Sequence, residues 1–592
     1  MRKLYLTFQY NQTMRSDTHN QPASAGFAKI ARSARLKPAE GFTFRQANRP
    51  TNPPKRIDLL AGRSKVGRLW TPLVILLFLI LSACAPILNA SQPYYFVTAQ
   101  SAPTLTPFQP GQATPAPTWP IPPSATPSPT AVPTLTATHA PPTSTALQSG
   151  FESTPDLPET PASRNSDELP TYNINALWNY TGRSLTVAQE IIYPNRSTDT
   201  LSTILLAVNP NLWHGTFALD SLTVNDQAIS NYTLSGQTLT LPLPAPLAPG
   251  ASLRIGLTYS LILPYSSGTF QNFGYTARQT NLIDWFPFVP PYFSGQGWVL
   301  SEPWTYGENF AYPLANFFIG LSFTEASPPT VAASAPAIQQ GNMLRYVLRG
   351  ARTFTFSASY DFQATSSEEN GITVTSYFFP EHYDAGQRIL LETQAAIRTY
   401  QNAFGPYPHT SLAIVETDLN DGLESDGLYF LASSFYANYD GSAANDLVMI
   451  GIHEAAHQWW FGGVSNDQAL EPWLDEALCT YSEHIFYEEN YPNLLNWWYN
   501  VRIRYYGPSG YADTRIYNTN SFRGYVNAVY LRGALFLDDL RDRIGDEAFF
   551  AFLRDYYARH QGRIATADTF FAVLADHTSN ADDLIGSYFY YR

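Results

Sequence analysis

The sequence HEAAH at His453–His457 lies inside a stretch, residues 446–462, whose apolar spacing predicts a helix. Two histidines four positions apart leave the same face of a helix, so both imidazoles can reach one ion. Glu454 is rotated by about 100° from His453, close enough to polarise a water on that ion without ligating it. This pattern arises by chance in about one of a hundred such sequences, so the flanking residues have to decide whether it is a metal site.

The residues after His457 narrow the type of metal site. A catalytic zinc usually takes three protein ligands and leaves a fourth position for water. The third histidine of a metzincin is excluded, because Trp460 occupies the position of the glycine that would precede it. Instead, Glu476 follows His457 after eighteen intervening residues, in the sequence EPWLDEALCTYSE at Glu471–Glu483.

This arrangement resembles a known peptidase family. The residues His453–Trp459, followed by WLDEA at Trp473–Ala477, resemble the aminopeptidase N family of gluzincins, which also includes leukotriene hydrolase. The resemblance implies a thermolysin-like catalytic domain, a Zn²⁺ cofactor and peptide substrates. It also implies that Glu454 is the general base and that the zinc ligands are His453, His457 and Glu476.

A second match to the family is NAVYLRGA at Asn527–Ala534, which resembles its Tyr-x-Lys-Gly segment. The resemblance places the transition-state tyrosine at Tyr530, whose phenol would donate a hydrogen bond to the developing oxyanion. Arg532 replaces the usual lysine. The alternative is that Tyr530 is one more core residue, since the chain holds 38 tyrosines.

A third match is DGLESDG at Asp421–Gly427, which resembles the exopeptidase segment Gly-x-Met-Glu-Asn. It implies that Glu424 binds the free α-amine of the substrate, because only a chain end presents an ammonium group to a carboxylate. Leu423 and Ser425 depart from the family pattern, which weakens the prediction of strict aminopeptidase specificity. The alternative is that Glu424 is an acid in an Asp/Gly-rich turn.

Other residues near Glu476 are candidates for supporting the site. Thr480 and Glu483 lie four and seven positions beyond Glu476 and share its helical face, where they could orient a ligand. For Glu483 the alternative is a solvated surface charge. Asp475 is a similar supporting candidate. The chain has only two cysteines, Cys84 and Cys479, which are too few for a disulfide framework. Cys479 is therefore expected to be a lone thiol that packs in the core.

The other cysteine, Cys84, follows a basic stretch and the apolar run Leu69–Leu81. The order resembles a bacterial lipoprotein signal, with Leu81–Cys84 as its lipobox. An apolar run of this length suits a signal segment and is shorter than the roughly 20 residues that span a bilayer. We therefore expect Cys84 to be lipidated and the protein to be tethered to the membrane outside the cytoplasm; an uncleaved anchor is the alternative.

Charge argues against a nucleic-acid partner. Residues 1–68 carry 14 of the 35 basic side chains and three acidic ones, whereas the rest of the chain carries 21 basic and 45 acidic ones. Such an acidic surface repels a phosphate backbone.

Composition and periodicity divide the chain of 592 residues into segments. Residues 1–62 form a basic extension that is either untranslated or disordered, and residues 63–84 form the signal segment. The Pro/Thr/Ser-rich residues 85–170 cannot bury a core and are predicted to be a tether. Alternating short segments predict an antiparallel β-sandwich or saddle domain at 171–365. A change to helical periodicity near residue 380 predicts an α+β, mainly helical zinc-peptidase domain at 366–592.

Together these features predict a multidomain zinc metallopeptidase that removes N-terminal residues from peptides outside the cytoplasm. Two alternatives stay open. One is an endopeptidase, or another zinc hydrolase, that uses the same site. The other is a non-catalytic surface-binding lipoprotein that retains a zinc, although a structural site would usually have a fourth protein ligand.

Overall fold

The computed structural model describes residues 168–266 and 273–592, which all belong to one compact unit of the chain. The predictions for residues 1–62, for the signal segment with Cys84, and for most of the tether at 85–170 lie outside the described residues. Within 168–266 and 273–592, no helix is both long and apolar enough to cross a lipid bilayer.

The first part of the described chain is built from strands. They are β1 (Thr171–Asn179), β2 (Ser184–Pro194), β3 (Leu201–Ala207), β4 (Phe217–Val224), β5 (Gln227–Ala228), β6 (Thr233–Ser235), β7 (Thr238–Leu247), β8 (Ser252–Ile262), β9 (Gly274–Tyr275), β10 (Thr280–Leu282), β11 (Tyr292–Phe293), β12 (Gly297–Trp298), β13 (Ala315–Phe323), β14 (Thr330–Ala333), β15 (Ile338–Gln340), β16 (Met343–Ala351) and β17 (Phe356–Ser359).

The second part combines one sheet with helices. Its strands are β18 (Gln363–Glu369), β19 (Ile372–Phe378), β20 (Ser411–Thr417), β21 (Leu423–Ser425) and β22 (Leu428–Ala432). Its α-helices are α2 (Tyr383–Ala403), α3 (Ser433–Ala437), α4 (Asp446–Ala456), α5 (Trp473–Asn490), α6 (Leu495–Trp498), α7 (Phe522–Val526), α8 (Gly533–Ile544), α9 (Asp546–His560), α10 (Ala567–His577) and α11 (Asp582–Tyr588). Two π-helical turns occupy Tyr499–Ile503 and Asn527–Arg532.

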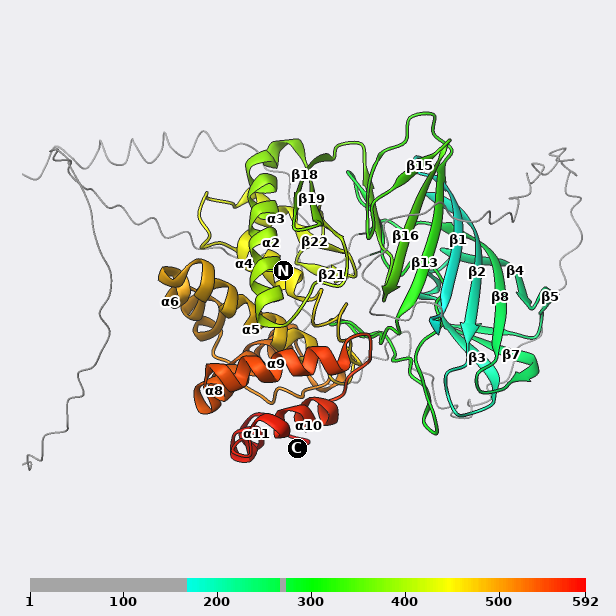
Figure 1. Ribbon diagram of the computed structural model, residues 1–592. Helices are drawn as coiled ribbons and strands as arrows, with labels where there is room; N and C mark the ends of the chain where they lie inside the picture. The colour runs from blue at the N-terminus through cyan, green and yellow to red at the C-terminus, as the bar shows by residue number, and fades with distance from the viewer. Residues whose placement is uncertain (1–167, 267–272) are drawn as a thin grey trace, which may run out of the picture. The chain divides into compact units, whose positions relative to one another are not determined.

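Apolar and polar residues alternate along the long strands of the main sheet, as β8 illustrates. In β8, Leu253, Ile255, Leu257, Tyr259 and Leu261 are buried, and the residues between them are exposed or partly exposed. This period of two buries one face of the strand. The resulting eight-stranded sheet has the order β15-β16-β13-β1-β2-β8-β4-β5, in which β1 runs parallel to its neighbour β13 and the other pairs are antiparallel. Figure 1 shows its long strands on the right-hand side of the molecule.

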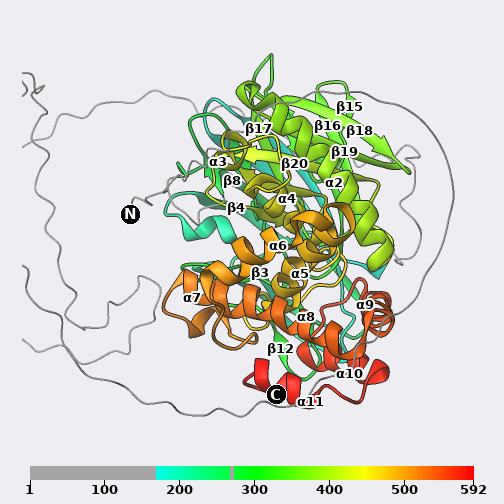
Figure 2. The same ribbon diagram turned by 90° about the vertical axis from the view of Figure 1, so that its left-hand side faces the viewer.

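The second part is organised around the five-stranded sheet β18-β19-β20-β22-β21. Helix α2 packs on β18 and β19, and α4 packs between α2 and α5 (Figures 1 and 2). A strand-rich part followed by a mainly helical part confirms the predicted fold class. Strand β18 begins at Gln363 and pairs with β19.

Arg352, which follows β16, joins the two parts through a buried guanidinium group. It donates hydrogen bonds to the backbone carbonyls of Tyr312 (2.8 Å), Gly462 (3.1 Å), Gly463 (3.1 Å) and Arg563 (2.9 Å). The first of these carbonyls belongs to the β part and the other three to the helical part. A buried charge is tolerated because its donors are satisfied in this way.

The helix that carries HEAAH is shorter than predicted. We expected it to reach Gly462, but α4 ends at Ala456. The next turns have a different hydrogen-bond pattern: the amides of Gly462, Gly463 and Val464 donate to carbonyls five residues earlier. A side chain at Gly463 would overlap the carbonyl of Trp459 and the ring of Tyr557, so this wider turn requires glycine.

Candidate metal centre

The two histidines stand at the C-terminal end of α4. Asn445 begins the helix as its N-cap, where its side chain accepts a hydrogen bond from the amide of Val448. His453 lies in the last turn of the helix and His457 is its C-cap residue. Both imidazoles are buried. Burial, and then the neighbouring His453, lower the pKa of His457 well below its usual value. The neutral imidazole that results is the form that binds a metal.

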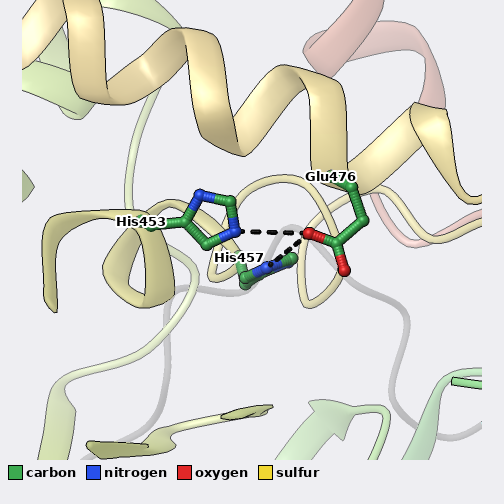
Figure 3. A group of neighbouring side chains, drawn as sticks. All are labelled: His453, His457 and Glu476. Atoms are coloured by element: carbon green, nitrogen blue, oxygen red, sulfur yellow. Dashed lines mark hydrogen bonds and ion pairs between the residues drawn. The ribbon is translucent and has the colours of Figure 1, made fainter. Parts of the chain in front are cut away.

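Glu476 approaches the histidines from the first turn of α5 (Figure 3). Its Oε2 lies 3.2 Å from Nε2 of His453 and 3.6 Å from Nε2 of His457. One ligand atom from each of these three residues lies within 4.8 Å of the others. Two imidazoles and one carboxylate, brought together from two helices, match the donor set of a catalytic zinc site. The residues present therefore fit the metal that the sequence predicts.

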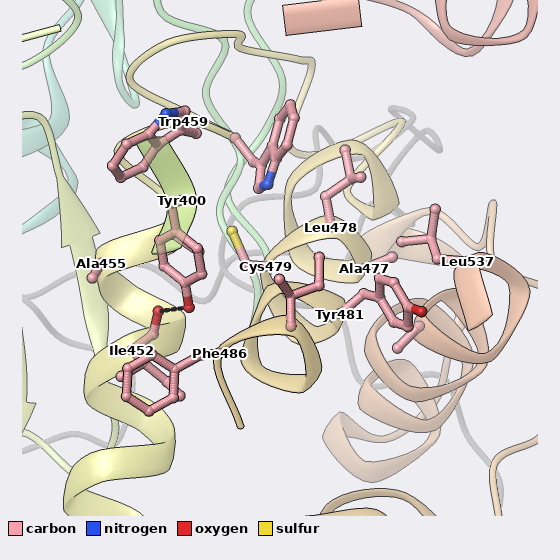
Figure 4. Packing of buried hydrophobic residues seen from close by; sticks show 14 of the residues in the cluster. Tyr400, Ile452, Ala455, Trp459, Ala477, Leu478, Cys479, Tyr481, Phe486 and Leu537 are labelled. Atoms are coloured by element: carbon pink, nitrogen blue, oxygen red, sulfur yellow. Dashed lines mark hydrogen bonds between the residues drawn. The ribbon is translucent and has the colours of Figure 1, made fainter. Parts of the chain in front are cut away.

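A buried apolar cluster fixes α4 against α5 and α2 (Figure 4). The hydroxyl of Tyr400 in α2 donates to the carbonyl of Ile452 (3.0 Å) and lies 3.3 Å from that of Ser482. Cys479 is part of this cluster, and burial raises the pKa of its thiol well above the usual value. Its surroundings suit a packing residue, because a reactive cysteine needs an accessible thiolate.

Glu483 is buried and is therefore not the solvated surface charge that was the alternative. It orients His453. Its Oε1 lies 2.8 Å from Nδ1 of His453, so the imidazole can donate there and present Nε2 to the centre. Arg502 donates to both carboxylate oxygens, and the indole of Trp498 donates to Oε2 (2.8 Å). Burial opposes ionisation of Glu483, but Arg502 and His453 hold its pKa below the usual value.

The other two supporting candidates make different contacts from those expected of ligand-orienting side chains. The hydroxyl of Thr480 donates to the backbone carbonyl of Glu476 (2.7 Å), a bond inside the helix that leaves the Glu476 carboxylate untouched. Asp475 accepts the amide of Glu476 through Oδ1 (2.8 Å) and the side chain of Gln468 through Oδ2 (3.2 Å). Asp475 therefore holds the backbone at Glu476.

Glu454 is buried beside the centre. No donor in the described parts of the chain reaches its Oε2, which leaves an acceptor for water or substrate. Burial, and then the charges of Glu424 and Glu476, raise its pKa well above the usual value. Gly422 lies so close that a Cβ there would overlap the Glu454 carboxylate. The segment that carries Glu424 therefore passes directly over the predicted base.

Glu424 lies in β21 at the end of the five-stranded sheet, opposite Tyr429 of β22. Its carboxylate is buried and accepts a hydrogen bond from Gln468 (2.8 Å). Burial raises its pKa, whereas the Gln468 bond and His453 act in the opposite direction. One oxygen of Glu424, one of Glu454 and a ring nitrogen of His457 lie within 4.8 Å of one another, so the segment DGLESDG reaches the same centre.

Tyr530 lies in the π-helical turn Asn527–Arg532 between α7 and α8. Its hydroxyl donates to Oε1 of Glu476 (2.6 Å), and its ring stacks on that of His453 with a centroid distance of 6.0 Å. Burial and the charge of Glu476 raise its pKa well above the usual value, so the phenol keeps its proton. Turns of this kind are frequent at functional sites.

The structure thus brings together all six site residues predicted within the described chain: His453, Glu454, His457, Glu476, Glu424 and Tyr530. Sequence reasoning missed Arg502, Trp498 and Gln468. None of them belongs to a recognisable motif, and each reaches the site from an irregular or distant segment. Their catalytic and binding roles stay predictions, as does the lipidation of Cys84.

Comparison with known proteins agrees with the geometry. Residues 389–588 match the model of the peptidase family M1 domain. The chain is 24% identical to aminopeptidase N of Lactobacillus delbrueckii subsp. lactis over 296 residues, 46% of this chain and 34% of that protein. It is 25% identical to endoplasmic reticulum aminopeptidase 1 of Mus musculus over 205 residues, 32% of this chain and 22% of that protein. The chain thus spans about a third or less of these curated relatives.

Solved structures share the fold. The M1 zinc metallopeptidase from Deinococcus radiodurans has a TM-score of 0.53 at 18% identity, and the match covers 71% of this chain and 93% of that one. A mutant of a Deinococcus radiodurans M1 zinc metallopeptidase, bound to a Tyr-Ser-Ala substrate, has a TM-score of 0.52 at 17% identity, over 71% and 93% of the two chains. These structural matches confirm the predicted fold, and the family model together with the curated relatives confirms the predicted family resemblance.

Proposed function

From the premise that the helical part of this chain is an aminopeptidase N-like M1 zinc-metallopeptidase domain, we propose that the protein removes single residues from the N-terminus of peptides. The observation that carries the proposal is the place of Glu424. Its carboxylate lies within 4.8 Å of both Glu454 and His457, so an amine anchor and a predicted base share one buried site.

This spacing favours the first peptide bond of a substrate. The α-amino nitrogen and the carbonyl carbon of one residue are about 2.5 Å apart. An ammonium group paired with Glu424 therefore puts the carbonyl of the same residue next to Glu454. A blocked or internal residue offers no positive charge, and it would leave the buried Glu424 carboxylate with the neutral Gln468 bond but without a positively charged partner.

The residues then have separate tasks. Zinc held by His453, His457 and Glu476 would polarise the scissile carbonyl and lower the pKa of the attacking water toward about 7. Glu454 takes a proton from that water and later delivers it to the leaving amine. The Tyr530 hydroxyl, whose single proton bonds Oε1 of Glu476 in the substrate-free site, turns to donate to the oxygen that becomes negative as the carbonyl turns tetrahedral. Glu483 keeps His453 in the orientation that faces the centre.

Aminoacyl fluorogenic substrates with a free or an acetylated amine test the proposal. We expect cleavage of the free-amine set only, loss of activity with a chelator, and loss of cleavage in Glu454→Gln with zinc retained. Equal cleavage of both sets would instead indicate an endopeptidase or another zinc hydrolase at the same site. If zinc binds and neither set is cleaved, a surface-binding role is favoured.

We also propose that the protein acts outside the cytoplasm, tethered through a lipid on Cys84. The support is the basic stretch, apolar run and lipobox at Leu81–Cys84 in the sequence. Mass spectrometry of the full chain from a bacterial membrane fraction should find an acylated Cys84 at the mature N-terminus. An unmodified Cys84 in an intact chain would contradict this proposal.

A further inference from the structure

Gln468 is a buried amide that the predicted mechanism does not use. It lies in the loop between α4 and α5 and is 2% exposed. Its backbone amide faces the carbonyl of Phe310 in the β part (3.4 Å). The side chain is thus held where the β part, the segment Asp421–Gly427 and α5 meet.

The two ends of the Gln468 amide have different surroundings. Nε2 donates to Oε1 of Glu424 (2.8 Å) and to Oδ2 of Asp475 (3.2 Å). Carboxylate oxygens of this kind act as acceptors, so two of them fix the NH₂ end of the amide on their side. The carbonyl end, Oε1, is the other branch of the same amide group and bonds neither carboxylate.

Across residues 168–266 and 273–592, no side chain or amide donates to Oε1 of Gln468. A buried amide oxygen without a donor is costly, so such a group is usually completed by water or by a ligand. A donor is therefore missing directly beside the carboxylate that is proposed to bind an ammonium group.

We propose, resting on the function proposed above, that Oε1 of Gln468 accepts a second hydrogen bond from the substrate's α-ammonium group. A primary ammonium has three N–H donors, and one carboxylate does not use them all. Glu424 supplies the charge and Gln468 supplies a directed neutral acceptor. Gln468 is then a specificity-determining residue that favours unsubstituted N-terminal amines over methylated ones.

Two variants of equal length test the role of this oxygen. Gln468→Met keeps the volume and removes both polar atoms, whereas Gln468→Glu keeps an acceptor oxygen. Loss of a hydrogen bond to a charged group corresponds to a roughly 10- to 100-fold effect. We expect Gln468→Met to raise KM for leucyl-aminomethylcoumarin, and Ki for free L-leucine, by about this factor. We expect kcat to stay within about threefold, zinc content to stay unchanged, and Gln468→Glu to recover most of the loss.

Several outcomes would overturn the inference. A KM and Ki within about twofold of the wild-type values in Gln468→Met would show that the oxygen contributes nothing to amine binding. A loss of equal size in Gln468→Glu would show that only the bond from Nε2 to Glu424 matters. Failure of the proposed function gives a different result, because the wild-type protein would then cleave acetylated substrates as readily as free ones.

A measurement on the unchanged protein keeps the inference testable if Gln468→Met loses zinc. N,N-dimethyl-L-leucine keeps the positive charge of L-leucine but has a single N–H donor. We expect it to inhibit at least tenfold more weakly than L-leucine. Equal inhibition by the two ligands would show that charge alone is recognised, which contradicts the inference.

Discussion

The hydroxyl of Tyr530 donates to Oε1 of Glu476, while Oε2 of the same carboxylate faces the two histidines. The predicted oxyanion donor and the predicted third zinc ligand are thus joined directly. Tyr530→Phe should lower kcat by roughly 100- to 1000-fold, the usual loss when one oxyanion donor is removed. Zinc content should be retained. Steady-state kinetics with metal analysis checks both expectations.

Tyr525→Phe is the matched control for that experiment. Tyr525 packs edge-on against Tyr530, and its buried hydroxyl has no hydrogen-bond partner among the described residues. Its removal should leave kcat within about twofold of the wild-type value. A Tyr530→Phe enzyme as active as this control would remove Tyr530 from the mechanism.

Glu483→Gln should weaken zinc binding by about 10- to 100-fold, the usual effect of losing a carboxylate that orients a histidine ligand. The substitution also leaves the Arg502 guanidinium, which is bonded to both Glu483 oxygens, without its negative partner. Competition with a chelating dye gives the zinc Kd. Thr480→Val is the control, because the Thr480 hydroxyl bonds the backbone carbonyl of Glu476 and not its carboxylate. Equal zinc affinities in the two variants would contradict the role of Glu483.

Gly422→Ala should lower kcat at least tenfold without loss of zinc. The added methyl group would overlap the Glu454 carboxylate, so the predicted base must move. Kinetics at saturating substrate with metal analysis measures the effect. Gly586→Ala in α11 adds the same methyl group in open space and should leave kcat unchanged. Unchanged kcat in Gly422→Ala would mean that the position of Glu454 tolerates the shift.

Asp284 predicts a pH dependence of stability in the β part. Burial is the main cause that raises its pKa from 3.8 to about 7. A carboxyl with a raised pKa binds its proton more tightly in the folded state. Its contribution to stability is therefore full below pH 3.8 and is lost as the pH rises toward about 7. The loss amounts to at most about 4 kcal/mol.

Asp284→Asn removes this titration. Asn also tolerates the positive φ of 49° at this position. We expect the variant to be more stable than the wild-type protein at pH 8, with a smaller difference at pH 4.5, by thermal unfolding. Asp226→Asn, an exposed residue with φ of 66°, is the control and should show no such pH-dependent gain. A similar Tm difference at both pH values would contradict the prediction.

Part of the site could be predicted because residues four positions apart in a helix lie on the same face. His453 and His457 share a helical face, and the spacing to Glu476 is carried by a motif that folds as a second helix. Glu424 and Tyr530 could be assigned to the same centre because the short motifs around them resemble those of the family. The β part could be assigned from alternation alone, as β8 shows.

Other features depend on contacts that no local pattern encodes. Arg502 lies in a π-helical turn, 19 residues beyond the Glu483 that it pairs with. Gln468 lies in a loop without periodicity. A shared helical face correctly placed Thr480 near Glu476, but it could not show that the hydroxyl bonds the backbone. The end of α4 was predicted too late, because crowding around Gly463 is visible only in three dimensions.

The guanidinium of Arg352 has a consequence for how the chain folds. Three of the four carbonyls that it bonds belong to the helical part, so the peptidase part takes a structural donor from the β part. A truncated protein that began at Gln363 would leave these carbonyls without their donor and would expose the surface that now packs on the β part. We expect such a fragment to be insoluble or unfolded, and the intact chain to unfold in one cooperative transition. The β part would then act as an intramolecular chaperone for the peptidase part.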